Sequence, residues 1–208
     1  MFRNKLFLLI MMVSGLLNAQ NDSLFNAKVE IKLNLTSALV LVPNIGIEVK
    51  LSEKLSYQLD TSASFYDNIE SSPFHTTQIF NELRFYPKLQ EGKNSRSFFI
   101  GPHIGYGMFT LRIPKFITSI VDTELKEEGS YQSGRNAYYG ITIGKKIPLK
   151  NNKLNLEFFI GGGSSQSNYK YYNKLGNRIY GNPNIKKDFN QSGEELIYRG
   201  GLMLTFKI

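Results

Sequence analysis

Apolar and polar residues alternate with period two in eight separate segments of this chain. Neighbouring side chains of a β-strand point to opposite faces, so each segment predicts a strand with one apolar and one polar face. The last segment alternates for about thirteen residues, which suits a tilted membrane-spanning strand or the wall of a closed barrel. The segments are residues 27–38, 44–51, 55–65, 76–86, 97–109, 137–147, 154–165 and 196–208.

The connections between these segments alternate in length. Short turns at one rim and long loops at the other are typical of outer-membrane barrels, and no segment competes as a long core helix. The sequence therefore predicts an all-β protein, an eight-stranded antiparallel up-and-down transmembrane β-barrel. The short turns are 52–54, 88–96 and 148–153, and the longer loops are 37–43, 66–75, 111–134 and 169–194.

The N-terminal residues have the layout of a secretory signal peptide. Two basic residues precede an apolar run at 6–17, and Ala19 stands at the expected cleavage site. We therefore predict a signal peptide at 1–19 and an outer-membrane barrel domain at 20–208, with a buried N-terminal helix as the alternative. No later apolar stretch is long enough for a membrane-spanning helix, so we expect any membrane insertion to use the strands.

The apolar faces point either to lipid or, in a soluble lipocalin-like barrel, to a ligand cavity. The polar faces are rich in glycine, which suits the crowded interior of a narrow barrel. Their charges are nearly balanced and can therefore pair inside, as buried charges require. These features favour lipid on the outside. The polar-face cations are Lys32, Lys50, Arg84, Lys146, Arg199 and Lys207, and the carboxylates are Glu30, Glu48, Asp60, Glu82 and Glu157.

An eight-stranded barrel has an interior just wide enough for its own side chains. We expect ion pairs to fill this interior, and we do not expect a wide diffusion pore. The predicted interior charge network consists of Lys32, Glu48, Lys50, Glu82, Arg84, Glu157 and Arg199.

The last strand is predicted to close the barrel by pairing with the first strand, near Val29 to Leu35. An unpaired edge would be costly in hydrocarbon, which favours closure. The terminal Phe206 and Ile208 also look like the C-terminal signal that outer-membrane barrels present to the assembly machinery.

In their order and spacing, these segments resemble a family of small outer-membrane barrels from Bacteroidota, domain of unknown function 3575. A broader likeness to the OmpA-type transmembrane barrel points the same way. The resemblance implies an eight-stranded barrel in the outer membrane and supplies no catalytic residues. The chain departs from the expected pattern in having no Trp, so Tyr and Phe must supply the interfacial belts. The matching pieces are PNIGIEVKLSEK (43–54), ELRFYPK (82–88), FFIGPHIGYGMF (98–109), YYGITIGKKIPL (138–149), KLNLEFFIGGG (153–163) and GGLMLTFKI (200–208).

His75 and His103 are the candidate imidazole bases. His103 lies on a glycine-rich inward face, where a hydrogen-bonded interior histidine is the simpler interpretation. His75 ends a predicted loop near Ser71 and Ser72, and lipid hydrolases of the outer membrane use Ser and His at the rim. Nothing in the sequence fixes that geometry. We predict no catalytic residue, no metal site and no cofactor, with a lipid hydrolase or acyltransferase as the alternative.

Two segments interrupt the strand pattern. GGGSS at 161–165 is followed by neither Lys nor a helix, so it predicts a bend or bulge and not a phosphate loop. Residues 113–129 predict a short rim helix, with a hairpin extension as the alternative. The apolar residues at helical spacing are Phe116, Ile117, Ile120, Val121 and Leu125.

The loop at 168–195 is rich in Asn and Tyr and carries an excess of cations. Tyr and Asn are common in binding loops, and cations suit phosphate or acidic sugars. We predict Tyr171, Tyr172 and Arg178 as binding residues, because hot spots favour Tyr and Arg. A solvated loop that only covers the barrel mouth is the alternative.

The formal net charge of +8 in an exported protein suggests anionic lipid head groups or surface glycans and not nucleic acid. We predict an outer-membrane protein with a structural or cell-surface interaction role. Its expected partners are outer-membrane lipid and lipopolysaccharide, and a surface glycan or another envelope protein. The alternatives are an accessory subunit of a secretion or fimbrial system, a lipid-modifying enzyme and a soluble lipocalin-like barrel.

Overall fold

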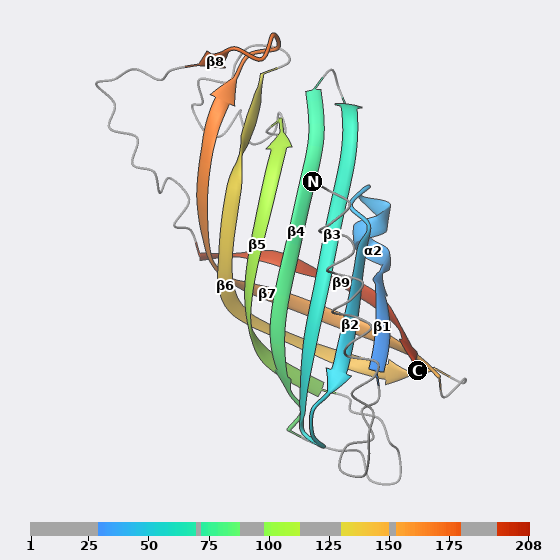
Figure 1. Ribbon diagram of the computed structural model, residues 1–208. Helices are drawn as coiled ribbons and strands as arrows, with labels where there is room; N and C mark the ends of the chain where they lie inside the picture. Colours follow the sequence, from blue (N-terminus) through green and yellow to red (C-terminus); the bar gives the residue numbers. More distant parts are fainter. Residues whose placement is uncertain (1–28, 70–71, 88–97, 113–129, 150–152, 180–194) are drawn as a thin grey trace, which may run out of the picture.

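The structure, a computed structural model, describes residues 29–69, 72–87, 98–112, 130–149, 153–179 and 195–208. These residues form one antiparallel sheet and a five-residue helix (Figure 1). The helix is too short to cross a membrane. The strands are β1 (Val29–Asn34), β2 (Asn44–Lys50), β3 (Leu55–Ile69), β4 (Ser72–Phe85), β5 (Phe98–Leu111), β6 (Tyr131–Pro148), β7 (Leu154–Tyr172), β8 (Arg178–Ile179) and β9 (Glu195–Lys207), and the helix is α2 (Leu35–Leu39).

The sheet closes into a barrel. Each of β1 to β7 pairs with the next strand, β7 pairs with β9, and β9 returns to β1. Glu30 lies opposite Lys207 and Asn34 opposite Met203, so the last strand meets the first as predicted. The short β8 pairs only with the end of β7, where Tyr171 lies opposite Ile179. The predicted eight-stranded antiparallel β-barrel is therefore confirmed.

The barrel wall is uneven in height. β1 and β2 have six and seven residues, whereas β6 and β7 have 18 and 19. Figure 1 shows the ends of β4 to β7 rising well beyond α2, which joins the two short strands. We call this end the upper rim and the end with the short turns, where β1 begins and β9 ends, the lower rim.

Several predicted loops are shorter than expected. The prediction of a loop at 66–75 is wrong, because β3 continues to Ile69 and β4 begins at Ser72. β6 begins at Tyr131 and β7 continues to Tyr172, so parts of the two longest predicted loops are strand. Aromatic residues fit paired strands well, and here they outweigh the Asn and Ser residues that suggested loops.

The distribution of side chains is inverted relative to a soluble protein. Charged residues such as Lys32, Arg84 and Glu157 have side chains with no exposed surface inside the barrel. Large apolar residues face outward, including Ile104 and Ile141, which are 63% and 56% exposed. The period of two therefore sets the two faces of the wall, as the sequence predicts.

A β-bulge interrupts the pairing of β7 with β9. Gly161 lies opposite Arg199 and Gly162 opposite Ile197, which leaves Tyr198 as the extra residue on β9. The sequence predicts a bend or bulge at 161–165, and the pairing does shift between Gly161 and Gly162, but the extra residue lies on β9 and not in the glycine run. Strict alternation over the predicted strand at 196–208 would place Tyr198 outward and Ile197 inward, and this is wrong because the bulge reverses the alternation. Tyr198 contacts interior residues, and Ile197 is 68% exposed.

Candidate functional site: the barrel interior and the upper rim

Glu48 on β2 is the centre of an ion-pair network near the lower rim. Its carboxylate accepts hydrogen bonds from the Ser56 hydroxyl at 2.6 Å and from the Tyr86 hydroxyl at 2.5 Å. A carboxylate removed from water is stable only when such donors replace its hydration. The cations that reach it are Lys32 Nζ at 2.5 Å, Arg84 NH1 at 3.0 Å and Lys146 Nζ at 2.9 Å.

Arg84 on β4 joins this centre to two further carboxylates. Its NH1 lies 2.8 Å from Glu157 Oε1, and its Nε donates to Glu82 Oε1 at 2.8 Å. Lys32 Nζ lies 2.5 Å from Glu157 Oε2. The Arg84 guanidinium also lies 4.0 Å above the centroid of the Phe99 ring. The planar fork of arginine suits this position, because it serves several carboxylates at once.

Arg199 on β9 extends the network toward the upper rim. Its NH2 donates to Asp60 at 2.8 Å, and its NH1 lies 3.0 Å from Glu82 Oε2. At the lower end, Lys146 Nζ donates to Glu30 at 2.6 Å. Together the charged members come from β1, β2, β3, β4, β6, β7 and β9, so that the network ties nearly the whole circumference together.

The structure brings most of the predicted interior charges together but leaves Lys50 aside. Lys50 is half-buried near the end of β2 and joins none of these ion pairs. Conversely, the prediction omitted Glu30, Asp60 and Lys146 from the network. The register explains why Lys146 belongs to the network. Glu30 lies directly opposite Glu48, and Lys146 forms ion pairs with both of these like charges. The predicted members in ion-pair contact are Lys32, Glu48, Glu82, Arg84, Glu157 and Arg199.

A layer of aromatic rings lies above the charges. Phe80 stacks on Tyr198 at 6.2 Å between ring centroids, and Tyr138 lies 4.9 Å from Tyr198. His103 completes the layer, with Nε2 2.6 Å from the Tyr198 hydroxyl and Nδ1 2.8 Å from Thr142 Oγ1. Both ring nitrogens of His103 thus have hydrogen-bond partners inside the barrel. The bulge adds Tyr198 to this layer, which strict alternation in the sequence does not predict.

Two glycines make room for interior rings. A Cβ atom at Gly105 would collide with the Phe80 ring, and one at Gly144 would collide with the Phe99 ring. Glycine therefore allows a full ring to fill the space beside each strand. Packed rings and paired charges fill the middle of the lumen, where Arg84, Phe99 and other large side chains have no exposed surface.

His75 lies at the upper rim, within β4 and not at the end of a loop as predicted. Its Nε2 lies 2.8 Å from Asp67 Oδ1, and the Asp67 side chain is 91% exposed. Ser72 begins β4, and Ser71 lies outside the described residues. The described residues thus provide a His–Asp pair at the upper rim.

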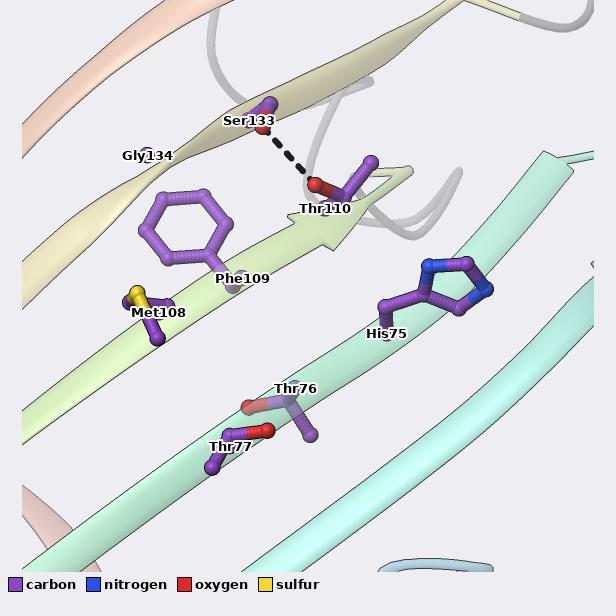
Figure 2. Close-up of a pocket in the computed structure, with 8 residues that line it drawn as sticks. All are labelled: His75, Thr76, Thr77, Met108, Phe109, Thr110, Ser133 and Gly134. Atoms are coloured by element: carbon purple, nitrogen blue, oxygen red, sulfur yellow. Dashed lines mark hydrogen bonds between the residues drawn. The ribbon is translucent and has the colours of Figure 1, made fainter. Parts of the chain in front are cut away.

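A shallow hollow of about 270 Å³ lies at the upper ends of β4, β5 and β6 (Figure 2). Thr110 and Ser133 stand side by side there on neighbouring strands, with their hydroxyl oxygens 2.7 Å apart. Its lining also contains the outward His75, Thr77 and Met108 and the inward Thr76, Phe109 and Gly134. Thr110 and Ser133 point outward, since they alternate with the inward Phe109 and Gly134.

The predicted binding residues lie in a hairpin and not in an irregular loop. Tyr172 lies opposite Arg178, and Tyr171 opposite Ile179. The Tyr172 ring stacks on Tyr131 at 5.4 Å with an interplanar angle of 15°. Tyr172 and Arg178 thus share a face of the hairpin, whereas Tyr171 points to the opposite face, where its ring contacts Tyr169. Residues 180–194 of this segment, the predicted rim helix at 113–129 and the signal peptide at 1–19 lie outside the described residues.

Within the described residues, no group of three His, Asp or Glu side chains is arranged to hold a metal ion. The fold and the interior define a closed eight-stranded antiparallel β-barrel whose lumen is filled by ion pairs and aromatic rings. The chain belongs to the family described as Protein of unknown function (DUF3575), which matches residues 5–190. Comparison with curated proteins and with solved structures gives no match.

Proposed function

We propose that this protein is an OmpA-like barrel of the bacterial outer membrane, of the kind found in Bacteroidota, with a structural or cell-surface interaction role. The observation that carries the proposal is the inverted wall. Inside lie buried ions such as Lys32 and Glu157, and outside lie exposed apolar residues such as Ile104 and Ile141. A soluble lipocalin-like barrel would turn its apolar face inward, so this arrangement supports lipid contact and argues against that alternative.

The outward apolar band has a suitable height for a membrane. Along β5 the outward residues run from Phe98 through Ile100 and Ile104 to Tyr106. At about 3.4 Å per residue this stretch is about 27 Å long, or roughly 19–22 Å along the membrane normal after the usual strand tilt. Aromatic residues stand at both ends of the band, as interfacial belts do. They include Phe85, Phe98, Phe158 and Phe206 toward the lower rim and Tyr106 and Tyr139 toward the upper rim.

The filled lumen supports a role other than diffusion. The ion pairs and rings across the middle of the barrel leave little room for a solute, in keeping with the size of eight-stranded barrels. By analogy with such barrels, the lower rim with its short turns would face the periplasm and the upper rim the cell exterior. The proposed partners are outer-membrane lipid and lipopolysaccharide, together with a surface glycan or another envelope protein. No enzymatic activity is proposed.

Cell fractionation tests the location. We expect the protein to require detergent for extraction from the outer membrane and to migrate faster on an unboiled gel than on a boiled one, because closed barrels resist unfolding. Recovery as a soluble periplasmic protein would contradict the proposal and would favour a ligand-binding barrel. Affinity purification from the detergent extract then tests a role as an accessory subunit, which predicts a secretion or fimbrial complex in the eluate.

A further inference from the structure

The described part of the upper rim carries cations on three neighbouring strands, β5 to β7, and no carboxylate on the upper parts of these strands or of β4. In the described upper parts of β4 to β7, at 72–78, 106–112, 130–139 and 163–172, there is no Asp or Glu. The cations there are Arg112, Arg135 and Lys170, and the adjoining strands carry Asp67, which pairs with His75, and Glu195.

Strand register places two of these cations beside the hollow lined by Thr110 and Ser133. Ser133 lies opposite both Thr110 and Lys170, and Arg135 lies opposite Asn168. Directly opposite residues of antiparallel strands share a face, and diagonal neighbours are only about 7–8 Å apart. Arg135 and Lys170 are therefore diagonal neighbours on the outer face, and both side chains are exposed.

Two hydroxyl groups that line the hollow lie next to these cations. Thr110 and Ser133 hydrogen-bond to each other at 2.7 Å, and both are only half-buried. The planar guanidinium of arginine donates hydrogen bonds in a geometry that matches phosphate oxygens. Lysine adds a positive charge, and hydroxyl groups add hydrogen-bond donors. This set of donors, with no carboxylate on the same strand segments, is complementary to a phosphate group.

The height of the patch matches a lipid head group. On β6 the outward Ile141 and Tyr139 are apolar, and Arg135 lies four residues beyond Tyr139 toward the upper rim. Those four residues correspond to about 13 Å along the strand, or about 10 Å along the membrane normal. Acyl chains on Ile141 and Tyr139 would thus place a head group near Arg135.

We propose that the outward patch formed by Arg135, Lys170, Thr110 and Ser133 binds the phosphate head group of an anionic lipid of the outer leaflet. The acyl chains of this lipid lie on the apolar band below. The inference rests on the proposed membrane location and adds a defined lipid site to it. Only a lipid satisfies both parts of the surface, because the donors adjoin a continuous apolar wall.

Native mass spectrometry of the full-length barrel in detergent micelles tests this site. Phosphatidic acid is the phosphorylated probe, and phosphatidylcholine is the zwitterionic one. We expect the wild type to bind phosphatidic acid about tenfold more tightly, and the double variant Arg135→Gln/Lys170→Gln to lose that preference. The matched control Lys54→Gln/Lys174→Gln removes the same charge at exposed turn positions and should keep it. A second variant, Thr110→Val/Ser133→Ala, should weaken the preference about threefold without any change in charge.

Each outcome bears on the proposal. Inorganic phosphate should not displace phosphatidic acid at comparable concentration. Displacement by phosphate would indicate a site for free anions and overturn lipid binding. Equal loss of preference in the matched control would show a non-specific charge effect and would also overturn it. A barrel that shifts on unboiled gels but shows no head-group preference contradicts only this site. A chain that never acquires the gel shift in detergent or vesicles contradicts the proposed function first.

Discussion

The lumen contains two layers that fill the same barrel by different means. Near the lower rim, Glu48 and Arg84 organise a network in which each charged group depends on several others. Above it, Phe80, Tyr138 and Tyr198 pack as rings with a few neutral hydrogen bonds. The comparison shows that the loss of one partner should destabilise the charged layer more than the aromatic layer. A buried charge that loses its partner keeps its full desolvation cost, whereas a ring that loses one contact loses only that contact.

The largest effect is expected in the charged layer. Arg84→Met removes the cation that serves Glu48, Glu82 and Glu157 and leaves these carboxylates short of compensation. We expect the free energy of unfolding to fall by about 3–5 kcal/mol, or the barrel to fail to assemble. Urea titration of the barrel in lipid vesicles, followed by the gel shift, measures this. Lys54→Met at an exposed turn position is the control and should change stability by less than about 0.5 kcal/mol. An Arg84→Met barrel as stable as the wild type would show that the network contributes little.

A medium effect is expected where a ring fills the space left by a glycine. Gly105→Val should destabilise the barrel by about 1–3 kcal/mol, because the new side chain collides with the Phe80 ring. The sign of the stability change is informative, because valine has a higher β-propensity than glycine and would stabilise the strand if there were no collision. Ala137→Val on the outer face of β6 tests the same gain in β-propensity without a collision and should be neutral or stabilising. The packing of the aromatic layer is refuted if both substitutions have the same effect.

The smallest effect is expected for a single neutral hydrogen bond in the aromatic layer. Tyr198→Phe keeps the ring but removes the hydroxyl that lies 2.6 Å from His103 Nε2. We expect a loss of about 1 kcal/mol in unfolding free energy. Tyr139→Phe, at an outward position that is 52% exposed, is the control and should have almost no effect. A loss as large as that of Arg84→Met would remove the distinction between the two layers.

The sequence predicts the wall well because alternation is a local property. Even its exceptions have structural reasons. Phe80 breaks the polar face and packs inside beside Gly105, whereas Asn81 breaks the apolar face and accepts a hydrogen bond from the Tyr57 hydroxyl. The charges at positions such as Glu48 and Arg84 could be assigned to the interior for the same reason, since each lies on the polar face of its strand.

What the sequence could not provide depends on contacts between distant residues. The inward turn of Tyr198 requires a bulge, and the bulge depends on how β9 meets the glycines of β7. The role of Lys146 follows from the register that brings Glu30 opposite Glu48. The extension of β6 and β7 likewise depends on their mutual pairing, which no local pattern near Tyr131 specifies.

The central claim is that the apolar face of the wall contacts lipid and the charged face lies inside. Because the chain has no Cys, spin labels can be attached at single introduced cysteines. Ile104 and Ile141 are suitable outward positions, and the small buried residues Ser62 and Ser165 are suitable inward ones. In lipid vesicles, we expect labels at the outward positions to collide mainly with dissolved oxygen, which concentrates in the bilayer, and labels at the inward positions to be shielded from it. Outward labels that collide mainly with a water-soluble nickel chelate would contradict the membrane-facing assignment.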